Sequence, residues 1–144
     1  MKTLLGFDYG QRKIGVAVGQ SLTGTAQGIT YLVVGKDGID WAELDKLAKI
    51  WKPSAIVVGL PLTSEGEETM SSKAARKFGN RVANHLRLTV YWVNEYLTSQ
   101  SAQHDLKSTL TQGKRFTKRK QKNRDLLAAE LILRSYFESN TTNS

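Results

Sequence analysis

Three carboxylates, far apart in the sequence, each lie beside a segment that predicts a secondary-structure element. Asp8 ends the apolar run "TLLGFD", Glu95 directly follows the run "LTVYWVN", and Asp125 opens the apolar segment "DLLAAELIL". A carboxylate withdrawn from water costs free energy unless it has a hydrogen-bond donor or a cation beside it. Asp8 is therefore either a structural hydrogen-bond acceptor or a cation ligand.

The residue types in the chain limit which cation these acids could hold. There is no cysteine, which excludes disulfides and thiolate metal sites, and the only histidines, His85 and His104, argue against a histidine zinc site. Carboxylates supply the hard oxygen ligands that Mg²⁺ and Mn²⁺ prefer. Simpler interpretations stay open, since Glu95 could be a solvated loop residue or a helix cap and Asp125 could cap the last helix.

The net charge points to a polyanionic partner. The chain has 21 Lys and Arg against 13 Asp and Glu, a net charge of +8, and residues 114–124, "KRFTKRKQKNR", carry seven basic side chains and no acidic one. Clustered cations displace counterions from nucleic acid, so this segment predicts a nucleic-acid contact, with a merely solubilising loop as the alternative. The candidate contacts are Arg12 and Lys13 in the first turn and Lys114, Arg115, Lys118, Arg119, Lys120, Lys122 and Arg124.

Strand and helix periodicities alternate along the chain. They predict strands at 3–8, 14–19, 28–34, 54–62 and 88–94, and helices at 41–51, within 63–86, at 98–110 and at 124–137. Asp40 is the expected N-cap of the first helix, and a Ser64–Glu67 capping box is one possible start of the second. Glu65, Glu67 and Glu68 are expected to form a solvated acidic loop without a role in the site.

This order of elements predicts an α/β fold with a five-stranded mixed sheet flanked by helices. Strands one to three form an antiparallel meander, and strands four and five run parallel to strand one. The carboxyl ends of parallel strands share one edge, where the three carboxylates can converge. Ala128 and Ala129 would let the last helix approach the sheet closely. We expect one domain at 1–138 and a flexible tail at 139–144.

The chain shows neither a signal peptide nor an apolar run of membrane-spanning length. A cytoplasmic protein without a membrane partner is therefore expected.

Several motifs together resemble the YqgF/RuvX family, across nearly the whole chain. They are "FDYGQRKIGVAVG", "IVVGLPL", "ARKFGNRV", the pair Asn94–Glu95 followed by "LTS", and the Asp that enters "AAELIL". The resemblance implies a ribonuclease H-like fold and places Asp8, Glu95 and Asp125 at the acidic positions of the family. The family commonly has Asp-Glu-Arg where this chain has Asn94, Glu95 and Tyr96, so the charges beside Glu95 differ.

The function implied by this resemblance is a metal-dependent nuclease with Mg²⁺ or Mn²⁺, expected as two ions. Two cations about 4 Å apart can activate water and neutralise the leaving oxygen of a phosphodiester. Asp8 is the expected bridging ligand, and Glu95 and Asp125 would complete the two sites. The implied reaction is 5′-end processing of pre-16S ribosomal RNA. Resolution of branched DNA at a Holliday junction is the alternative, and the oligomeric state, monomer or dimer, stays open.

Two other classes of protein compete with a nuclease. The "FDYGQRKIGVAV" segment also resembles the phosphate-binding hairpin of actin-like and sugar-kinase proteins, but those enzymes close two such domains around a nucleotide and 144 residues supply one. A non-catalytic nucleic-acid-binding module is the stronger rival. Asn94 and Tyr96 favour it, whereas the presence of all three carboxylates argues against it.

Overall fold

The computed structural model describes residues 2–94 and 126–141. Within these ranges the strands and helices are β1 (Thr3–Asp8), β2 (Lys13–Gln20), β3 (Thr25–Gly35), β4 (Gly38–Ile39), α1 (Trp41–Trp51), β5 (Ala55–Leu60), α2 (Met70–Leu86), β6 (Thr89–Asn94) and α5 (Leu127–Thr141). The predicted helix at 98–110 lies outside the described residues. No described helix is both long enough and apolar enough to cross a membrane.

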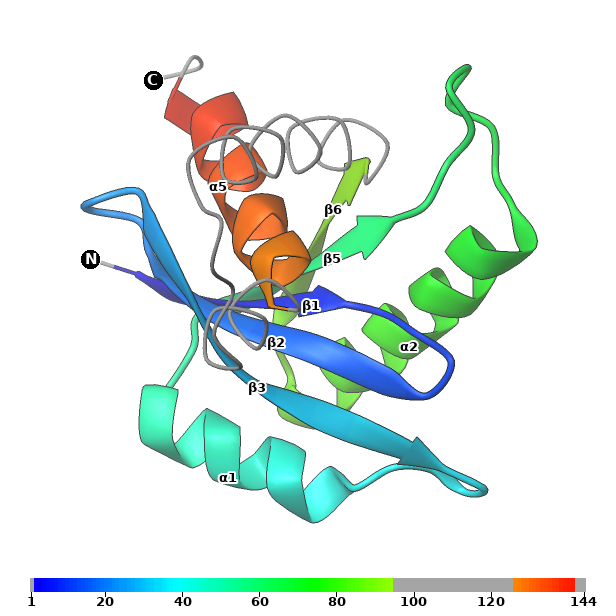
Figure 1. Cartoon of the computed structure of the whole chain (residues 1–144). Coiled ribbons are helices and arrows are strands. Elements are labelled where there is room, and N and C mark those ends of the chain that lie inside the picture. Colours follow the sequence, from blue (N-terminus) through cyan, green and yellow to red (C-terminus); the bar gives the residue numbers. More distant parts are fainter. Residues whose placement is uncertain (1, 95–125, 142–144) are drawn as a thin grey trace, which may run out of the picture.

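The strands form one mixed sheet in the order β4-β3-β2-β1-β5-β6 (Figure 1). β1 pairs antiparallel with β2 and parallel with β5, and β5 pairs parallel with β6, as predicted. The sheet has six strands rather than the expected five, because Gly38–Ile39, directly after the turn, pairs with β3 as a short edge strand. Gly38 adopts a φ of 97°, which lets the chain reverse tightly and pair Ile39 with Val34.

The helices cover both faces of the sheet, with α1 and α2 on one side and α5 on the other (Figure 1). Successive strand residues point to opposite faces, so Leu5 and Phe7 of β1 pack toward α1 and α2, whereas Leu4 packs toward α5. β5 is buried along its whole length. This explains its continuous apolar sequence, since both of its faces lie under helices.

Helix α5 lies very close to the sheet because glycines face it. A methyl group added at Gly6 would lie 2.6 Å from Leu133 Cγ, and one added at Gly28 would lie 2.5 Å from Leu126 Cβ. Ala129 is fully buried at the same contact, which confirms the expected use of a small residue there. The helix reaches Thr141, beyond the residue at which its apolar pattern ends.

A side-chain hydrogen bond also ties α5 to the sheet. β3 carries a register shift opposite Val16 and Ala17, and there the backbone N–H of Gly28 donates to Glu130 Oε1 at 2.8 Å. This bond satisfies a backbone donor beside an irregularity in the ladder. It also fixes the start of α5 over β2 and β3.

The first helix begins where the sequence predicts. Asp40 accepts hydrogen bonds from the backbone N–H groups of Ala42 and Glu43, at 3.0 and 3.4 Å, and so caps α1. Trp41 and Trp51, at the two ends of α1, are half-buried and pack against the core.

The predicted Ser64–Glu67 capping box is wrong, because α2 begins at Met70. Thr69 and Ser72 form the capping box instead. Residues 63–66 make a turn in which Gly66 has a φ of 82°, a conformation that no helix start can contain.

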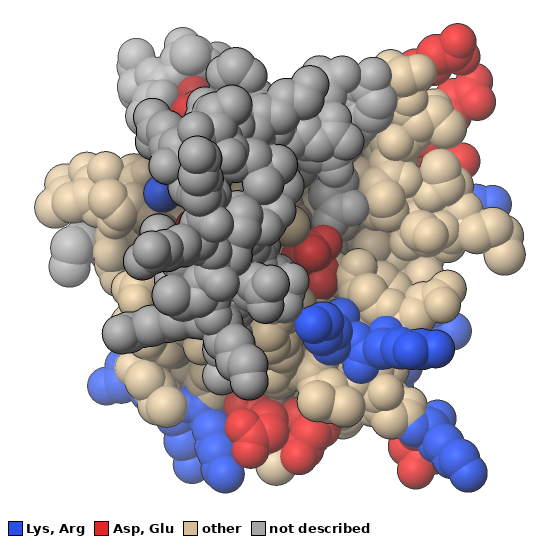
Figure 2. Space-filling view, viewed as in Figure 1, with Lys and Arg blue, Asp and Glu red and all other residues tan. Residues whose placement is uncertain are grey.

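The acidic side chains of the loop between β5 and α2 gather at the edge of the molecule (Figure 2). Glu68 is more than a solvated residue, because its carboxylate accepts hydrogen bonds from the Ser72 hydroxyl and from Arg76 Nε. It therefore belongs to the network that begins α2.

Candidate active site

Asp8 lies at the carboxyl end of the central strand β1, on the face covered by α5. It is half-buried and pairs with Gly15 of β2. A methyl group added at Gly15 would lie 3.7 Å from the Cβ of Asp8 and 3.7 Å from the Cβ of Ala129. The carboxylate is thus carried beside the first turn of α5, on a rigid strand, and the missing side chain at Gly15 leaves space next to it.

The described residues provide no hydrogen bond or ion pair to the Asp8 carboxylate. A half-buried carboxylate without a donor is unfavourable unless a cation accompanies it. Of the two explanations for Asp8, this favours a cation ligand over a structural acceptor.

Glu95 and Asp125 lie outside the described residues, but the residues next to them are described. Asn94, before Glu95, ends β6 and pairs with Leu60 at the carboxyl end of β5. Leu126, after Asp125, places its Cδ2 3.7 Å from a methyl group added at Gly15. Asn94 and Leu126, the sequence neighbours of the two acids, therefore lie at the same end of the sheet as Asp8.

Lys13 and Tyr31 share the face and the end of the sheet on which Asp8 lies. Tyr31 of β3 pairs with Gly15, and Lys13 Nζ lies 4.4 Å from the centroid of the Tyr31 ring. Tyr31 was not singled out from the sequence. Its strand was predicted, but only the pairing of β2 with β3 brings this phenol into the row of Asp8 and Gly15.

Of the other predicted nucleic-acid contacts, only Arg12 lies within the described part of the chain. Its side chain is exposed at the end of the β1–β2 hairpin, and its backbone carbonyl accepts a hydrogen bond from Val34 N–H at 2.8 Å. Lys114, Arg115, Lys118, Arg119, Lys120, Lys122 and Arg124 lie outside the described residues.

The donor chemistry at this edge fits a hard divalent cation. Residues 2–94 and 126–141 by themselves contain no group of three or more His, Cys, Asp or Glu that could hold a metal. Glu95 and Asp125, the other two ligands expected from the sequence, lie outside these ranges.

A model of the RuvX family, described as "Holliday junction resolvase", matches residues 2–139 of this chain. The chain belongs to the RuvX family. Curated relatives named "Putative pre-16S rRNA nuclease" include proteins from Actinobacillus succinogenes, 41% identical over 94% of both chains, and Pseudomonas putida, 39% identical over 98% of both. The family resemblance expected from the sequence is thereby confirmed.

Solved structures that resemble this fold include Holliday junction resolvases. The RuvC of T. thermophilus in complex with a Holliday junction substrate has a TM-score of 0.58 at 14% identity, covering 98% of this chain and 96% of that one. The fowlpox virus Holliday junction resolvase has a TM-score of 0.54 at 15% identity, covering 96% and 99%. At such identities the likeness concerns the fold, and it confirms the ribonuclease H-like architecture. As a RuvX family member, the chain is a nuclease, a hydrolase of phosphodiester bonds.

Proposed function

We propose that this RuvX family protein hydrolyses the precursor of 16S ribosomal RNA at its 5′ end, using Asp8, Glu95 and Asp125 as ligands for Mg²⁺ or Mn²⁺. The proposed metal site rests above all on the surroundings of Asp8. Its carboxylate is half-buried at the carboxyl end of a parallel strand and has no donor among the described residues. The names of the relatives supply the RNA substrate.

The positions of Asn94 and Leu126 support the convergence of the three acids. Both residues lie at or beside the edge that carries Asp8, and each is the sequence neighbour of another acid. A bound pair of divalent ions would supply an activated water and charge neutralisation at the leaving oxygen. The chain holds the Asp8 ligand rigid, because β1 is the central strand and α5 packs directly beside it.

Basic residues next to this edge would hold the nucleic acid. Lys13 lies on the face of Asp8, and Arg12 is exposed at the end of the same hairpin. The basic segment at 114–124 precedes Asp125 directly in the sequence. Together these cations would place a phosphate backbone over the acids, since backbone contacts fix the register of a nucleic acid on a protein. With an RNA precursor as its substrate, the protein is also proposed to act in the cytoplasm.

Holliday junction cleavage is the second candidate, favoured by the description of the family model that matches the chain. One assay separates the two. Purified protein with Mn²⁺ is incubated with an oligonucleotide that carries the 5′ precursor sequence of 16S ribosomal RNA, and in parallel with a synthetic four-way DNA junction. We expect cleavage of the RNA and an intact junction. Cleavage of the junction alone, by paired symmetric incisions, would replace the first proposal with the second.

A further inference from the structure

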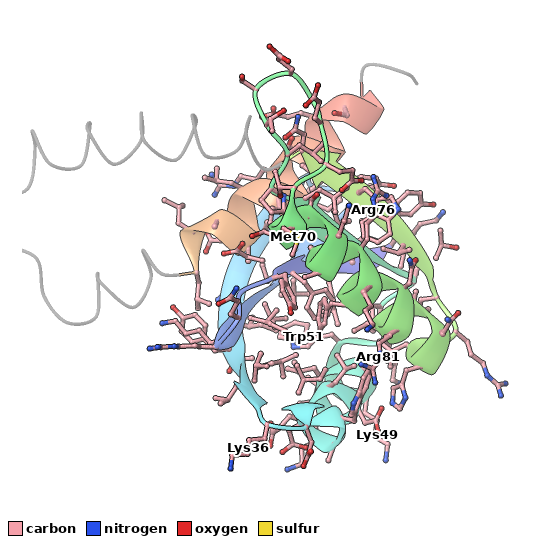
Figure 3. All side chains as sticks on the ribbon, turned by 90° about the vertical axis from the view of Figure 1, so that its right-hand side faces the viewer. Lys36, Lys49, Trp51, Met70, Arg76 and Arg81 are labelled. Atoms are coloured by element: carbon pink, nitrogen blue, oxygen red, sulfur yellow. The ribbon has the colours of Figure 1, made fainter. Side chains whose placement is uncertain are left out.

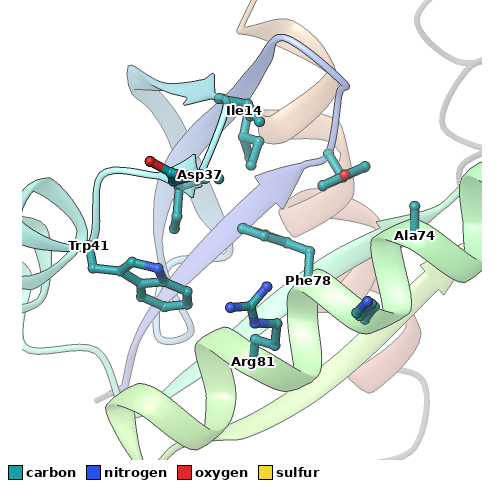
Figure 4. Close-up of a pocket in the computed structure, with 11 residues that line it drawn as sticks. Ile14, Asp37, Trp41, Ala74, Phe78 and Arg81 are labelled. Atoms are coloured by element: carbon teal, nitrogen blue, oxygen red, sulfur yellow. The ribbon is translucent and has the colours of Figure 1, made fainter.

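A cavity of about 350 Å³ opens on the face of the sheet opposite to α5. It lies between α2, the hairpin of β3 and β4, and the start of α1, and its walls include Tyr9, Ile14, Trp41, Lys77, Phe78 and Arg81 (Figure 4). Ligand sites range from about 300 to 1,000 Å³, so this one has room for a small ligand and none for a double helix.

The interior of this cavity is aromatic. Phe78 is buried, and its ring centroid lies 5.3 Å from that of Tyr9. Trp41 is half-buried and presents its indole to the cavity from the start of α1 (Figure 4). Flat apolar rings on several sides of a small cavity suit a flat, conjugated ligand, since such rings stack on it.

The mouth of the cavity is cationic. Lys77 and Arg81 are exposed residues one turn apart on α2, and the Arg81 guanidinium carbon lies 5.8 Å from the Trp41 ring centroid. In Figure 3, Arg81 extends from α2 toward α1, whereas Arg76 extends toward β6, away from the cavity. Asp37 is the acidic residue at the rim, and it is exposed. Two cations beside aromatic walls favour a ligand with a planar ring and an anionic group.

The cavity and Asp8 lie on opposite faces of the sheet, near the same end of β1. Tyr9 lines the cavity and directly follows Asp8, and consecutive residues at the end of a strand point to opposite faces of its sheet. A nucleic-acid strand that passes Asp8 would therefore have to turn round the carboxyl end of β1, at Tyr9, to reach the cavity on the other face.

We propose that the cavity binds one unpaired nucleotide of the substrate strand. The base enters between Trp41 and Phe78, and a phosphate of the same strand contacts Lys77 and Arg81. The assignment of the nucleotide to the substrate strand rests on the proposed nuclease function. The affinity of the cavity for a nucleotide does not, because it follows from the walls and the charges of the cavity alone.

The test is a titration of the metal-free protein with AMP, followed by NMR of the Trp41 indole N–H and of the Lys77 and Arg81 amides. Ribose 5-phosphate serves as the probe without a base. We expect AMP to shift these signals, and ribose 5-phosphate to bind at least about fivefold more weakly, because base stacking on aromatic side chains contributes that much or more. Absence of AMP shifts at these residues, or equal affinity for the two probes, overturns the proposal.

Charge-matched variants add a second measurement. The double variant K77Q/R81Q removes both cations at the mouth, and K46Q/K49Q removes two exposed cations of α1 that do not line the cavity. AMP affinity should fall about tenfold in the first and stay unchanged in the second, since a phosphate binds more weakly without charged donors beside it. Equal affinities in the two variants contradict the proposal. If K77Q/R81Q fails to fold, the comparison of AMP with ribose 5-phosphate on the wild-type protein decides.

These results are independent of cleavage. If AMP binds in the cavity but neither the RNA nor the junction is cleaved, the cavity is still a nucleotide site, but the assignment of its nucleotide to a nuclease substrate fails. If the protein cleaves a substrate but does not bind AMP, the proposed nucleotide site is wrong and the proposed nuclease function is unaffected.

Discussion

At the scale of single residues, the position of Asp8 is costly without a ligand. Its carboxylate is half-buried beside Ala129, on a strand that cannot move aside, and the described residues offer it no donor. A bound divalent cation would stabilise this carboxylate, which explains why an acid occupies the position. Gly15 serves the same purpose, because a larger side chain there would fill the space beside the carboxylate.

Replacing Asp8 with Asn should abolish cleavage and preserve the fold. The change removes the negative charge at nearly constant volume, and we expect activity with Mn²⁺ to fall by more than about 100-fold, since even residues that only support metal ligands cost about 10–100-fold. Added Mn²⁺ should raise the unfolding temperature of the wild-type protein and leave that of D8N unchanged. Glu65→Gln, an equal charge change on the exposed loop, is the control. Normal cleavage by D8N would remove Asp8 from the mechanism.

At the scale of elements, the start of α2 depends on a small polar network. Ser72 is fully buried, and its hydroxyl connects the backbone N–H of Thr69 with the Glu68 carboxylate, while Thr69 itself donates to the backbone carbonyl of Pro61. Thr69 Oγ1 also accepts a hydrogen bond from the backbone N–H of Ser72, so the network satisfies the N–H groups of the N-cap and of one first-turn residue. These bonds also join the loop after β5 to α2, the helix that carries Lys77 and Arg81.

The network predicts a pH-dependent stability. Hydrogen bonds from Ser72, and then from Arg76, lower the pKa of Glu68 below its ordinary value of 4.5. A carboxyl whose pKa is lower in the folded state stabilises the fold above its unfolded pKa, and this stabilisation is lost as the pH falls through the folded pKa. Wild type should therefore unfold at a higher temperature than Glu68→Gln at pH 7, and the difference should shrink below about pH 4.5.

Thermal unfolding followed by circular dichroism from pH 7 to pH 3 measures this difference. Glu65→Gln, which lies in the same loop, should match wild type throughout. A difference for Glu68→Gln that stays constant into the acid range would show that its charge has no part in the network.

At the scale of the whole molecule, the net charge of +8 is unevenly placed. Seven of the basic residues lie within 114–124, next to Asp125, whereas the acidic loop between β5 and α2 lies at the edge of the molecule. We expect such a run of cations in the sequence to attract a polyanion and to add affinity without sequence preference.

Replacing Lys118, Arg119 and Lys120 together with Ala should weaken binding of an RNA and of a DNA junction by similar factors. The logarithm of the binding constant should also fall less steeply with the logarithm of salt concentration, by about 0.7–0.9 for each phosphate that the variant no longer neutralises. Fluorescence anisotropy at several salt concentrations gives both quantities. Lys2, Lys46 and Lys49, replaced by Ala in one protein, form the charge-matched control. Equal salt slopes for wild type and K118A/R119A/K120A would show that the segment does not bind phosphate.

Local patterns in the sequence determined the elements and the position of Asp8 on them. The alternation in "TLLGFD" and the unbroken apolar run of β5 follow from one or two buried faces, and Asp40 caps α1 through contacts within its own turn. Local patterns were less informative where a turn competes with a helix. Ser64 and Glu67 have the spacing of a capping box, but the turn at Gly66 ends that possibility and moves the start of α2 to Met70.

Contacts between distant segments were decided only by the tertiary structure. The edge strand β4, the close packing of α5 on Gly6 and Gly28, and the row of Tyr31, Gly15 and Asp8 each join residues that no local period connects. The cavity belongs to the same class, because Tyr9, Trp41 and Arg81 meet only after α1 and α2 pack on one face of the sheet. The spacing of apolar residues in the sequence indicates which side of a helix or strand is apolar. Which element lies against that side depends on the free energy of packing the whole chain, and it is this packing that builds the cavity and the surroundings of Asp8.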